Sequence, residues 1–265
     1  MSARLRSAVQ NGPALACRGL RVSIAGRLLV DRLDLTLDEG SMLGVLGQNG
    51  SGKTTTLHTL AGLHAPSAGR VELYGESVPD LTRRRVARRL GLMLQHQEDP
   101  FPSTVLETAM AGRHPHIDMW RWESQSDLET AIQALAEVGL DGLEDRVVDT
   151  LSGGERRRLS LATLLAQTPD IYLLDEPTNH LDPAYERKVM TRLRDLADAG
   201  RSVAASLHDV NLASRFCDRC LLLFGDGSWR EGETQEVLTE ETLSRLYGIN
   251  MHRIEWKGES LFFAA

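Results

Sequence analysis

The chain has 265 residues, of which 42% are hydrophobic and 25% charged, a composition typical of one large globular domain. Its net charge of -7 argues against a general nucleic-acid-binding surface, which is normally basic, so no nucleic-acid partner is expected. The sequence holds no apolar run long enough for a membrane span, and its three cysteines are too few for a disulfide framework. We therefore expect a protein of the reducing cytoplasm.

The N-terminal half is predicted to contain strands first and helices later. Residues 1–14 lack the apolar core of a secretory signal and are predicted to be a loose tail. Strand-rich sequence covers about 16–94, with turns predicted at 38–40 and 68–69. Residues from about 96 to 150 have helical patterns and are predicted to form an inserted lobe. Its helices are predicted over 105–110 and 127–138, and its Trp120 and Trp122 are expected to pack locally, with contact to a membrane or partner as the alternative.

Residues 47–54 match the phosphate-loop pattern G-x-x-x-x-G-K-[ST]. They follow an apolar run suited to a buried strand, Met42–Leu46, and precede a predicted helix over 54–63. Glycines let successive N–H groups point at phosphate oxygens at the positive end of that helix. Lys53 supplies charge for the β- and γ-phosphates, and the Thr54 hydroxyl suits Mg²⁺. The predicted nucleotide-binding residues of this segment are Gly47, Gln48, Asn49, Gly50, Ser51, Gly52, Lys53, Thr54 and Thr55.

The segment Leu151-Ser152-Gly153-Gly154-Glu155 stands immediately before an amphipathic run over 156–167. The N-terminus of the predicted helix offers free N–H groups, a serine hydroxyl and a positive dipole to an anion. Ser152 and Glu155 also form the pattern of a capping box. The two roles are compatible, because a good cap organises the anion site.

A second apolar run, Ile171–Leu174, is followed by the carboxylates Asp175 and Glu176, which is the Walker B pattern. A ligand site is expected off the carboxyl end of such a buried strand. Asp175 is predicted to hold Mg²⁺ through water, and Glu176 to polarise the water that attacks the γ-phosphate. Two adjacent acids at a strand end are also compatible with a solvated exit, but the phosphate loop upstream favours the catalytic interpretation.

With these motifs the chain resembles the nucleotide-binding subunits of ABC transporters, whose signature is LSGGQ; here Glu155 replaces the glutamine. The resemblance begins near residue 15 and covers nearly all of the chain beyond it. It implies a P-loop NTPase (RecA-like) α/β core with an antiparallel β subdomain and an inserted α-helical subdomain, together spanning 15–238, and a C-terminal extension over 239–265. A capped helix over 240–247 is predicted in that extension. ATP and Mg²⁺ are the implied cofactors.

The resemblance also implies roles for single residues. Gln95 matches the glutamine that touches Mg²⁺ and links hydrolysis to the membrane partner, and His208 matches the histidine that contacts the γ-phosphate. Asp182 matches the D-loop residue that lines a dimer seam. Ile24 stands where the family usually has an aromatic residue stacked on adenine, so we expect relaxed base discrimination. The implied catalytic residues are Lys53, Gln95, Glu176 and His208; the implied Mg²⁺ ligands are Thr54, Gln95 and Asp175; and Ser152, Gly153 and Gly154 reach the nucleotide of a second copy.

Three stretches, 101–105, 112–116 and 175–182, are similar to the branch that imports ferric siderophores, haem and cobalamin. The implied assembly is a homodimer of ATPase subunits bound to transmembrane permease subunits and, indirectly, to a substrate-binding protein. The chain would then lie on the inner face of the cell membrane. The alternatives are a non-transport ABC ATPase, acting on the ribosome or in iron–sulfur assembly, and an ABC exporter subunit.

Overall fold

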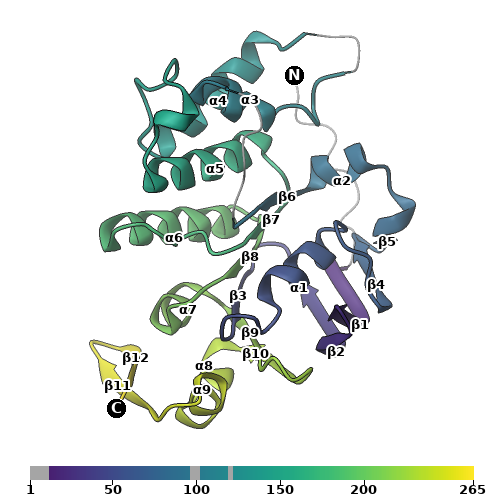
Figure 1. The fold of residues 1–265 in the computed structure, drawn as a ribbon, viewed down its shortest axis with the longest axis vertical. Coiled ribbons are helices and arrows are strands. Elements are labelled where there is room, and N and C mark those ends of the chain that lie inside the picture. The colour runs from purple at the N-terminus through teal and green to yellow at the C-terminus, as the bar shows by residue number, and fades with distance from the viewer. Residues whose placement is uncertain (1–11, 96–101, 119–121) are drawn as a thin grey trace.

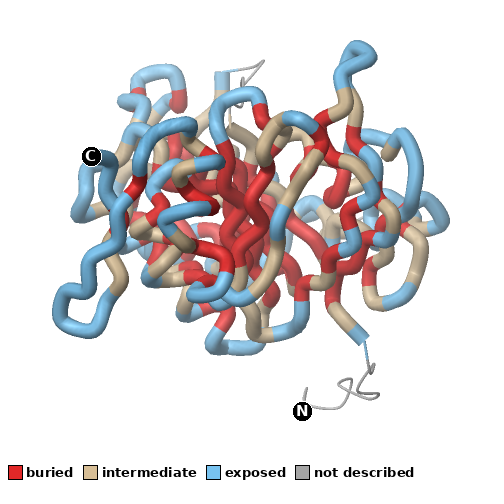
Figure 2. The backbone as a smooth tube through the Cα atoms, turned by 90° about the horizontal axis from the view of Figure 1, so that it is seen from below, coloured by how far each residue is buried: buried red, intermediate tan, exposed pale blue. Residues whose placement is uncertain are grey.

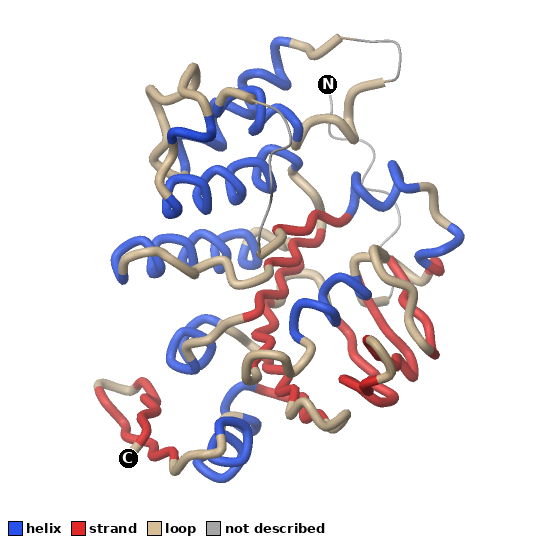
Figure 3. The backbone as a smooth tube through the Cα atoms, viewed as in Figure 1, coloured by secondary structure: helices blue, strands red, loops and turns tan. Residues whose placement is uncertain are grey.

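The computed structural model describes residues 12–95, 102–118 and 122–265. A six-stranded sheet forms its centre, and helices lie on both sides of this sheet (Figures 1 and 3). The strands are β3 (Met42–Leu46), β6 (Leu90–Met93), β7 (Ile171–Leu174), β8 (Ser202–Ser206), β9 (Arg219–Leu223) and β10 (Trp229–Glu233). Their order is β10-β9-β3-β8-β7-β6, and all neighbours are parallel except β9 and β10. The predicted α/β fold class is confirmed.

The central strands are apolar along their whole length because both of their faces are covered. In β3, Met42 and Leu46 belong to the hydrophobic core on one side of the sheet, whereas Leu43 and Val45 belong to the core on the other side. Buried residues accordingly concentrate along this sheet (Figure 2). The two cores fix the strands, and therefore also the loops that leave their carboxyl ends.

A smaller antiparallel sheet packs beside the central one. Its strands are β1 (Leu15–Ile24), β2 (Arg27–Leu37), β4 (Ala68–Leu73) and β5 (Glu76–Ser77), in the order β2-β1-β4-β5. Apolar side chains of this sheet share one core with helix α1 (Lys53–Leu60) and with one face of the central strands. This sheet is the antiparallel β subdomain that the family resemblance implied.

The turn predicted at residues 68–69 is wrong, because both residues lie inside β4. Gly69 has φ +82°, and a Cβ there would lie 2.4 Å from the carbonyl oxygen of Gly19. The pairing of β1 with β4 shifts register between Arg18 and Arg21, opposite this glycine. Gly69 therefore permits a close crossing at a β-bulge and does not end the strand.

Three helices form a layer at one end of the molecule: α3 (Val105–Ala111), α4 (Gln125–Glu137) and α5 (Gly153–Gln167). The first two confirm the helices predicted over 105–110 and 127–138. The layer continues past residue 150, because α5 shares a core with both other helices through side chains such as Leu159 and Leu135. The remaining helices of this half are α2 (Arg83–Arg89) and the 3-10 turns η1 (Val78–Asp80) and η2 (Val148–Thr150).

Helices α6 (Pro183–Asp198) and α7 (Val210–Phe216) cover the other face of the central sheet. The C-terminal part contains α8 (Thr234–Val237), α9 (Glu240–Tyr247) and a hairpin of β11 (Met251–Trp256) with β12 (Glu259–Ala264). The helix predicted over 240–247 is confirmed, with Thr239 as its N-cap. The hairpin is fastened to α7, where the Asn211 side chain bonds both the N–H and the C=O of Phe262.

Within the described ranges no helix combines the length and the hydropathy needed to cross a bilayer. The local packing expected for Trp122 is wrong, because 91% of this residue is exposed. It precedes Ser124, the N-cap of α4, and so lies outside the apolar face of that helix. Trp120 lies outside the described residues.

Candidate functional site

The phosphate-loop segment joins β3 to α1 at the carboxyl edge of the central sheet. Gly52 is the N-cap of α1 with φ +105°, a conformation that L side chains rarely adopt. At Gly47 a Cβ would lie 2.4 Å from the Ser51 hydroxyl oxygen and 2.6 Å from the carbonyl oxygen of Leu223. These two positions therefore require glycine, and together they allow the backbone to form the tight loop that precedes α1.

Lys53 is almost fully buried, with 4% of the residue exposed. Its Nζ donates to the carbonyl oxygens of Gly47 at 2.8 Å and Gln48 at 3.4 Å. Burial lowers the pKa of this ammonium group, while the nearby carboxylates Glu176 and Asp175 act in the opposite direction. A phosphate at the loop would supply the negative charge that compensates the buried cation.

Asp175 follows β7 and is fully buried. Its Oδ1 accepts a hydrogen bond of 2.6 Å from the Ser206 hydroxyl, whereas its Oδ2 is buried without a hydrogen-bond partner among the described residues. A buried carboxylate oxygen without a donor is costly unless a cation or a bound water faces it. The residue types predicted to hold Mg²⁺, namely Asp175, Thr54 and Gln95, therefore suit this ion, which prefers oxygen ligands.

Glu176 is also buried, and three side chains surround its carboxylate. Gln95 Nε2 donates to Oε2 at 2.7 Å, and Asn179 Nδ2 donates to the same oxygen. His208 Nε2 lies 2.7 Å from Oε1. The Ser206 hydroxyl accepts from the Glu176 N–H at 2.8 Å, so one hydroxyl links both acids. The structure thus brings together Gln95, Glu176 and His208, which are far apart in the sequence.

Sequence analysis missed Asn179 and Ser206 as partners of the two acids. Asn179 lies within the stretch 175–182, but nothing in that stretch indicates that its amide turns back to Glu176. Ser206 ends β8, next to β7 in the sheet, and its role depends on that pairing. A polar residue at the end of an otherwise apolar strand was the available signal.

A cavity of about 410 Å³ lies against the phosphate loop. Ile24, at the end of β1 and 51% exposed, lines one wall of it. Arg27 and Leu29, which follow the turn after Ile24, line it too and were not foreseen. The feature that could have indicated them is the short hairpin turn after Ile24, which places the first residues of β2 beside Ile24. The other lining residues come from the loop, from the start of α1 and from the acidic edge: Asn49, Gly50, Gly52, Lys53, Thr54, Thr55, Gln95 and Glu176.

The family comparison agrees with this geometry. The family model described as ABC transporter matches residues 30–179, which is more than half of the chain. The chain belongs to the ABC transporter family. The resemblance drawn from the motifs is therefore confirmed.

Three curated ATP-binding proteins illustrate the relationship to this family. The chain is 38% identical over 227 residues to the cobalamin import ATP-binding protein BtuD of Halobacterium salinarum, a match that covers 85% of the chain and 56% of that protein. It is 37% identical over 223 residues to the ferric enterobactin transport ATP-binding protein FepC of Escherichia coli, covering 83% and 82%. It is 37% identical over 252 residues to the hemin import ATP-binding protein HmuV of Myxococcus xanthus, covering 92% and 94%. The chain thus spans about half the length of the cobalamin relative.

Two solved structures share the fold. One is a metal-chelate type ABC transporter in an inward-facing conformation, with a TM-score of 0.82 and 31% identity, covering 95% of this chain and 97% of that one. The other is the dimeric bacterial ABC transporter cassette MJ0796, with a TM-score of 0.73 and 26% identity, covering 83% and 98%.

The segment that corresponds to the ABC signature begins α5. Ser152 Oγ accepts from the Glu155 N–H at 3.3 Å, and Glu155 Oε2 accepts from the Ser152 N–H at 2.7 Å, so the predicted capping box is confirmed. Arg146 pairs with the same Glu155 at 3.2 Å. Ser152 and Gly153 are exposed. Within the described residues, the lining of the phosphate-loop cavity includes neither these two nor Gly154.

The predicted D-loop residue Asp182 is an exposed N-cap in this structure. Its Oδ1 accepts from the N–H groups of Ala184 and Tyr185, both at 3.0 Å, at the start of α6. Gly154 lies nearby, since a Cβ on it would be 3.6 Å from the carbonyl oxygen of His180. The signature and the D-loop therefore form one edge of the protomer, separate from the cavity that holds the phosphate loop.

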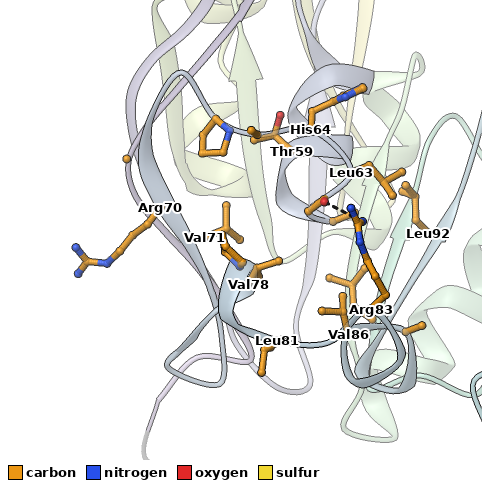
Figure 4. Close-up of a pocket in the computed structure, with 18 of the residues that line it drawn as sticks. Thr59, Leu63, His64, Arg70, Val71, Val78, Leu81, Arg83, Val86 and Leu92 are labelled. Carbon is orange, nitrogen blue, oxygen red and sulfur yellow. Dashed lines mark hydrogen bonds between the residues drawn. The ribbon is translucent and has the colours of Figure 1, made fainter.

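A larger, apolar groove of about 720 Å³ lies away from the acidic residues, between the end of α1, β4, α2 and β6 (Figure 4). Arg83 crosses it and donates to the Gly62 carbonyl oxygen at 3.4 Å. Leu63 is half exposed at this groove, and the groove includes Leu92 of the strand that leads to Gln95. Its apolar walls are formed mainly by Leu63, Val71, Val78, Leu81, Val86 and Leu92.

Proposed function

We propose that this chain is the ATP-hydrolysing subunit of an importer for a metal-chelate substrate, in the class of ferric siderophores, haem and cobalamin. One observation carries the proposal of hydrolysis. Glu176 stands beside the phosphate loop, one residue after the buried Asp175, and both Gln95 and His208 contact its carboxylate. The substrate class is supported by the three curated relatives and by the metal-chelate type neighbour.

The chemistry follows from the charged groups around the cavity. ATP would occupy the cavity with its phosphates at the N–H groups of residues 47–55 and its base near Ile24. Glu176 orients and polarises the attacking water once nucleotide draws Gln95 and His208 away from it. Lys53 and His208 offset charge that develops on the γ-phosphate. Bound Mg²⁺, held by Thr54, Gln95 and Asp175, would supply positive charge at the β- and γ-phosphate oxygens.

Two copies would complete each other. The exposed edge with Ser152, Gly153 and Gly154 offers donors at the N-terminus of a helix, but the cavity of its own chain lies elsewhere. In a head-to-tail dimer each nucleotide lies between one phosphate loop and the signature of the other copy, with Asp182 at the seam. The dimeric structure of a related cassette supports the formation of a dimer. ATP then favours the closed dimer because only that state provides both sets of contacts.

The permease partner is proposed to dock in the apolar groove. A groove with apolar walls and few charges suits an amphipathic helix. Because β6 lines the groove and leads to Gln95, a helix docked there would be coupled to the acidic edge. The subunit would thereby be held on the cytoplasmic face of the membrane, and a substrate-binding protein would act on the opposite face of the permease.

The test of hydrolysis is Glu176→Gln in the full chain. ATP binding and nucleotide-dependent dimerisation should be retained, while kcat falls by roughly 10²- to 10⁴-fold because the general base is lost. ATPase assays and size-exclusion chromatography with ATP measure the two properties. Glu241→Gln, on the exposed face of α9, is the matched control and should keep kcat. Normal turnover by Glu176→Gln would contradict the assignment of the base.

A further inference from the structure

Arg157 is a buried arginine on α5, little more than one turn after Ser152. Only 7% of the residue is exposed. The four hydrogen bonds that its guanidinium group donates all end on main-chain carbonyl oxygens. The burial of this cation requires a structural explanation, because removing a guanidinium group from water costs free energy.

The four carbonyl groups form two pairs. Nη1 donates to Leu94 at 2.7 Å and to Gln95 at 3.0 Å. Nη2 donates to Asp175 and, at 2.5 Å, to Glu176. Each pair belongs to the two peptide groups that flank one Cα atom. One nitrogen therefore holds the backbone of Gln95 on both sides, and the other holds the backbone of Glu176 on both sides.

These carbonyl groups lie where the strand ladder ends. β6 ends at Met93 and β7 at Leu174, and the Asp175 N–H makes a bond to the Met93 carbonyl oxygen just beyond the last paired residues. Glu176 has φ +52°, an unusual conformation for a residue with a side chain. Arg157 satisfies buried acceptors on both sides of this strained residue and so stabilises its conformation.

The arginine fork is suited to this task in a way that lysine is not. A planar guanidinium group presents donors on two terminal nitrogens at a fixed spacing, whereas an ammonium group is a single point. Burial lowers the pKa of Arg157, and the nearby Asp175 and Glu176 oppose that shift. The Nε of Arg157 is buried without a hydrogen-bond partner in the described part of the chain, so the contacts are concentrated on the two terminal nitrogens.

We propose that Arg157 is a positioning residue for ATP hydrolysis that fixes Gln95 and Glu176 relative to each other and transmits movements of α5 to both. The proposal rests on the proposed function. The two side chains that it aligns make a 2.7 Å hydrogen bond to each other in this structure, and both this contact and its release by nucleotide depend on the spacing of the two backbones. A displacement of the guanidinium group would change that spacing without any direct contact to nucleotide.

The position of Arg157 on α5 connects the two nucleotides of a dimer. The N-terminus of α5 carries Ser152 and Gly153, which would contact the nucleotide held by the partner copy. A helix transmits displacement over one turn as a nearly rigid body. Nucleotide at the partner's phosphate loop would then move Arg157 and adjust Glu176 in the first copy. The consequence is positive cooperativity in ATP hydrolysis that depends on this side chain.

The experiment compares the full chain with Arg157→Lys and Arg157→Gln in steady-state ATPase assays over a range of ATP concentrations. Misplacement of the base should lower kcat by roughly 10- to 100-fold while KM for ATP changes by no more than about twofold. The Hill coefficient for ATP should fall from above one to one in both variants. A partly unfolded preparation would also lower the apparent kcat at constant KM, but its folded fraction would keep the wild-type Hill coefficient. Loss of the Hill coefficient in a folded variant is therefore the readout that a role in folding alone would not give.

Two controls keep the outcome interpretable. Arg192→Gln removes a partly exposed arginine that pairs with Glu137 on the surface, and it should keep wild-type kcat and Hill coefficient. Thermal unfolding of each variant tests whether the chain is folded; Arg157→Lys keeps charge and most of the volume and is the variant that decides if Arg157→Gln does not fold. Wild-type kcat and Hill coefficient in Arg157→Lys would overturn the proposal. A wild-type chain without ATPase activity would instead overturn the proposed function.

Discussion

The phosphate-loop edge and the signature edge of this protein differ in how they treat charge. At the phosphate loop, Lys53 and Glu176 are buried, and their hydrogen-bond partners come from the same chain. At the start of α5, Ser152 and Gly153 are exposed, and the helix N-terminus faces outward. The phosphate-loop edge is organised around buried ionisable side chains. The signature edge presents exposed N–H donors at a helix N-terminus, and these donors do not line the cavity of their own chain.

This difference indicates how the work of catalysis is divided. Buried charges are costly unless they are compensated, so the acids are held by neighbouring side chains and the lysine by carbonyl oxygens of the loop until a phosphate enters. Exposed N–H donors at a helix N-terminus cost little, because water satisfies them in the meantime. An edge of the second kind is suited to forming and breaking a contact in each cycle.

The largest effect is expected when the phosphate-loop edge is disabled in one copy and the signature edge in the other copy. Lys53→Ala removes the charge at the phosphate loop, and Gly154→Glu places a bulky acid at the signature, so each variant alone should lose nearly all ATPase activity. In a mixture, head-to-tail heterodimers contain one intact composite site, and activity should return to at most about a quarter of the wild-type value per chain, or less where the two sites cooperate. Steady-state ATPase assays of the mixture measure it.

The matched control for that experiment is Lys53→Ala alone at the same total protein concentration, which should stay inactive because both phosphate loops of its homodimer are disabled. If the mixture of the two variants is no more active than the sum of its components, each site belongs to one chain alone. The division of labour between the two edges would then be wrong.

A second prediction concerns the apolar groove, which belongs to neither edge. Leu63→Arg introduces a charge at a position that is 50% exposed at the rim of the groove. Co-purification of the chain with its permease should fall by roughly tenfold, because a buried unpaired charge opposes docking. Ile254→Arg, at an equally exposed apolar position of β11, should co-purify normally. Undiminished permease binding by Leu63→Arg would exclude this groove as the docking surface.

The smallest expected effect concerns Ile24, at the end of the phosphate-loop cavity where the nucleotide base is proposed to bind. The wild-type kcat/KM values for ATP and GTP should agree within about tenfold, because Ile24 covers a base without aromatic stacking. Ile24→Tyr should lower KM for ATP by roughly 2- to 10-fold, which corresponds to the energy of one stacked pair. Ile254→Tyr is the control. A strong preference of the wild-type chain for ATP would contradict relaxed discrimination.

Local patterns predicted much of this structure. The helix over 240–247 and the helix that begins after Ser152 were predictable because their caps are encoded within a few residues. The turn at Ala68-Gly69 failed for the opposite reason. Gly69 has a tertiary role, since it allows β4 to cross β1 closely at a bulge, and no local pattern distinguishes that from a turn.

The sequence alone determined the phosphate loop, the two acids after β7 and the order of the family motifs, because each is a short pattern whose chemistry is contained in its own residues. The α/β class followed from the family that these motifs resemble. Only the tertiary structure decided which groups meet. Gln95 and Glu176 are bonded across 81 positions, and Arg157 reaches Leu94 across 63. Such contacts arise because strands that are distant in the sequence are neighbours in the sheet, so that their carboxyl ends meet at one edge. The spacing of residues within a short motif does not determine which distant residues lie close together in space.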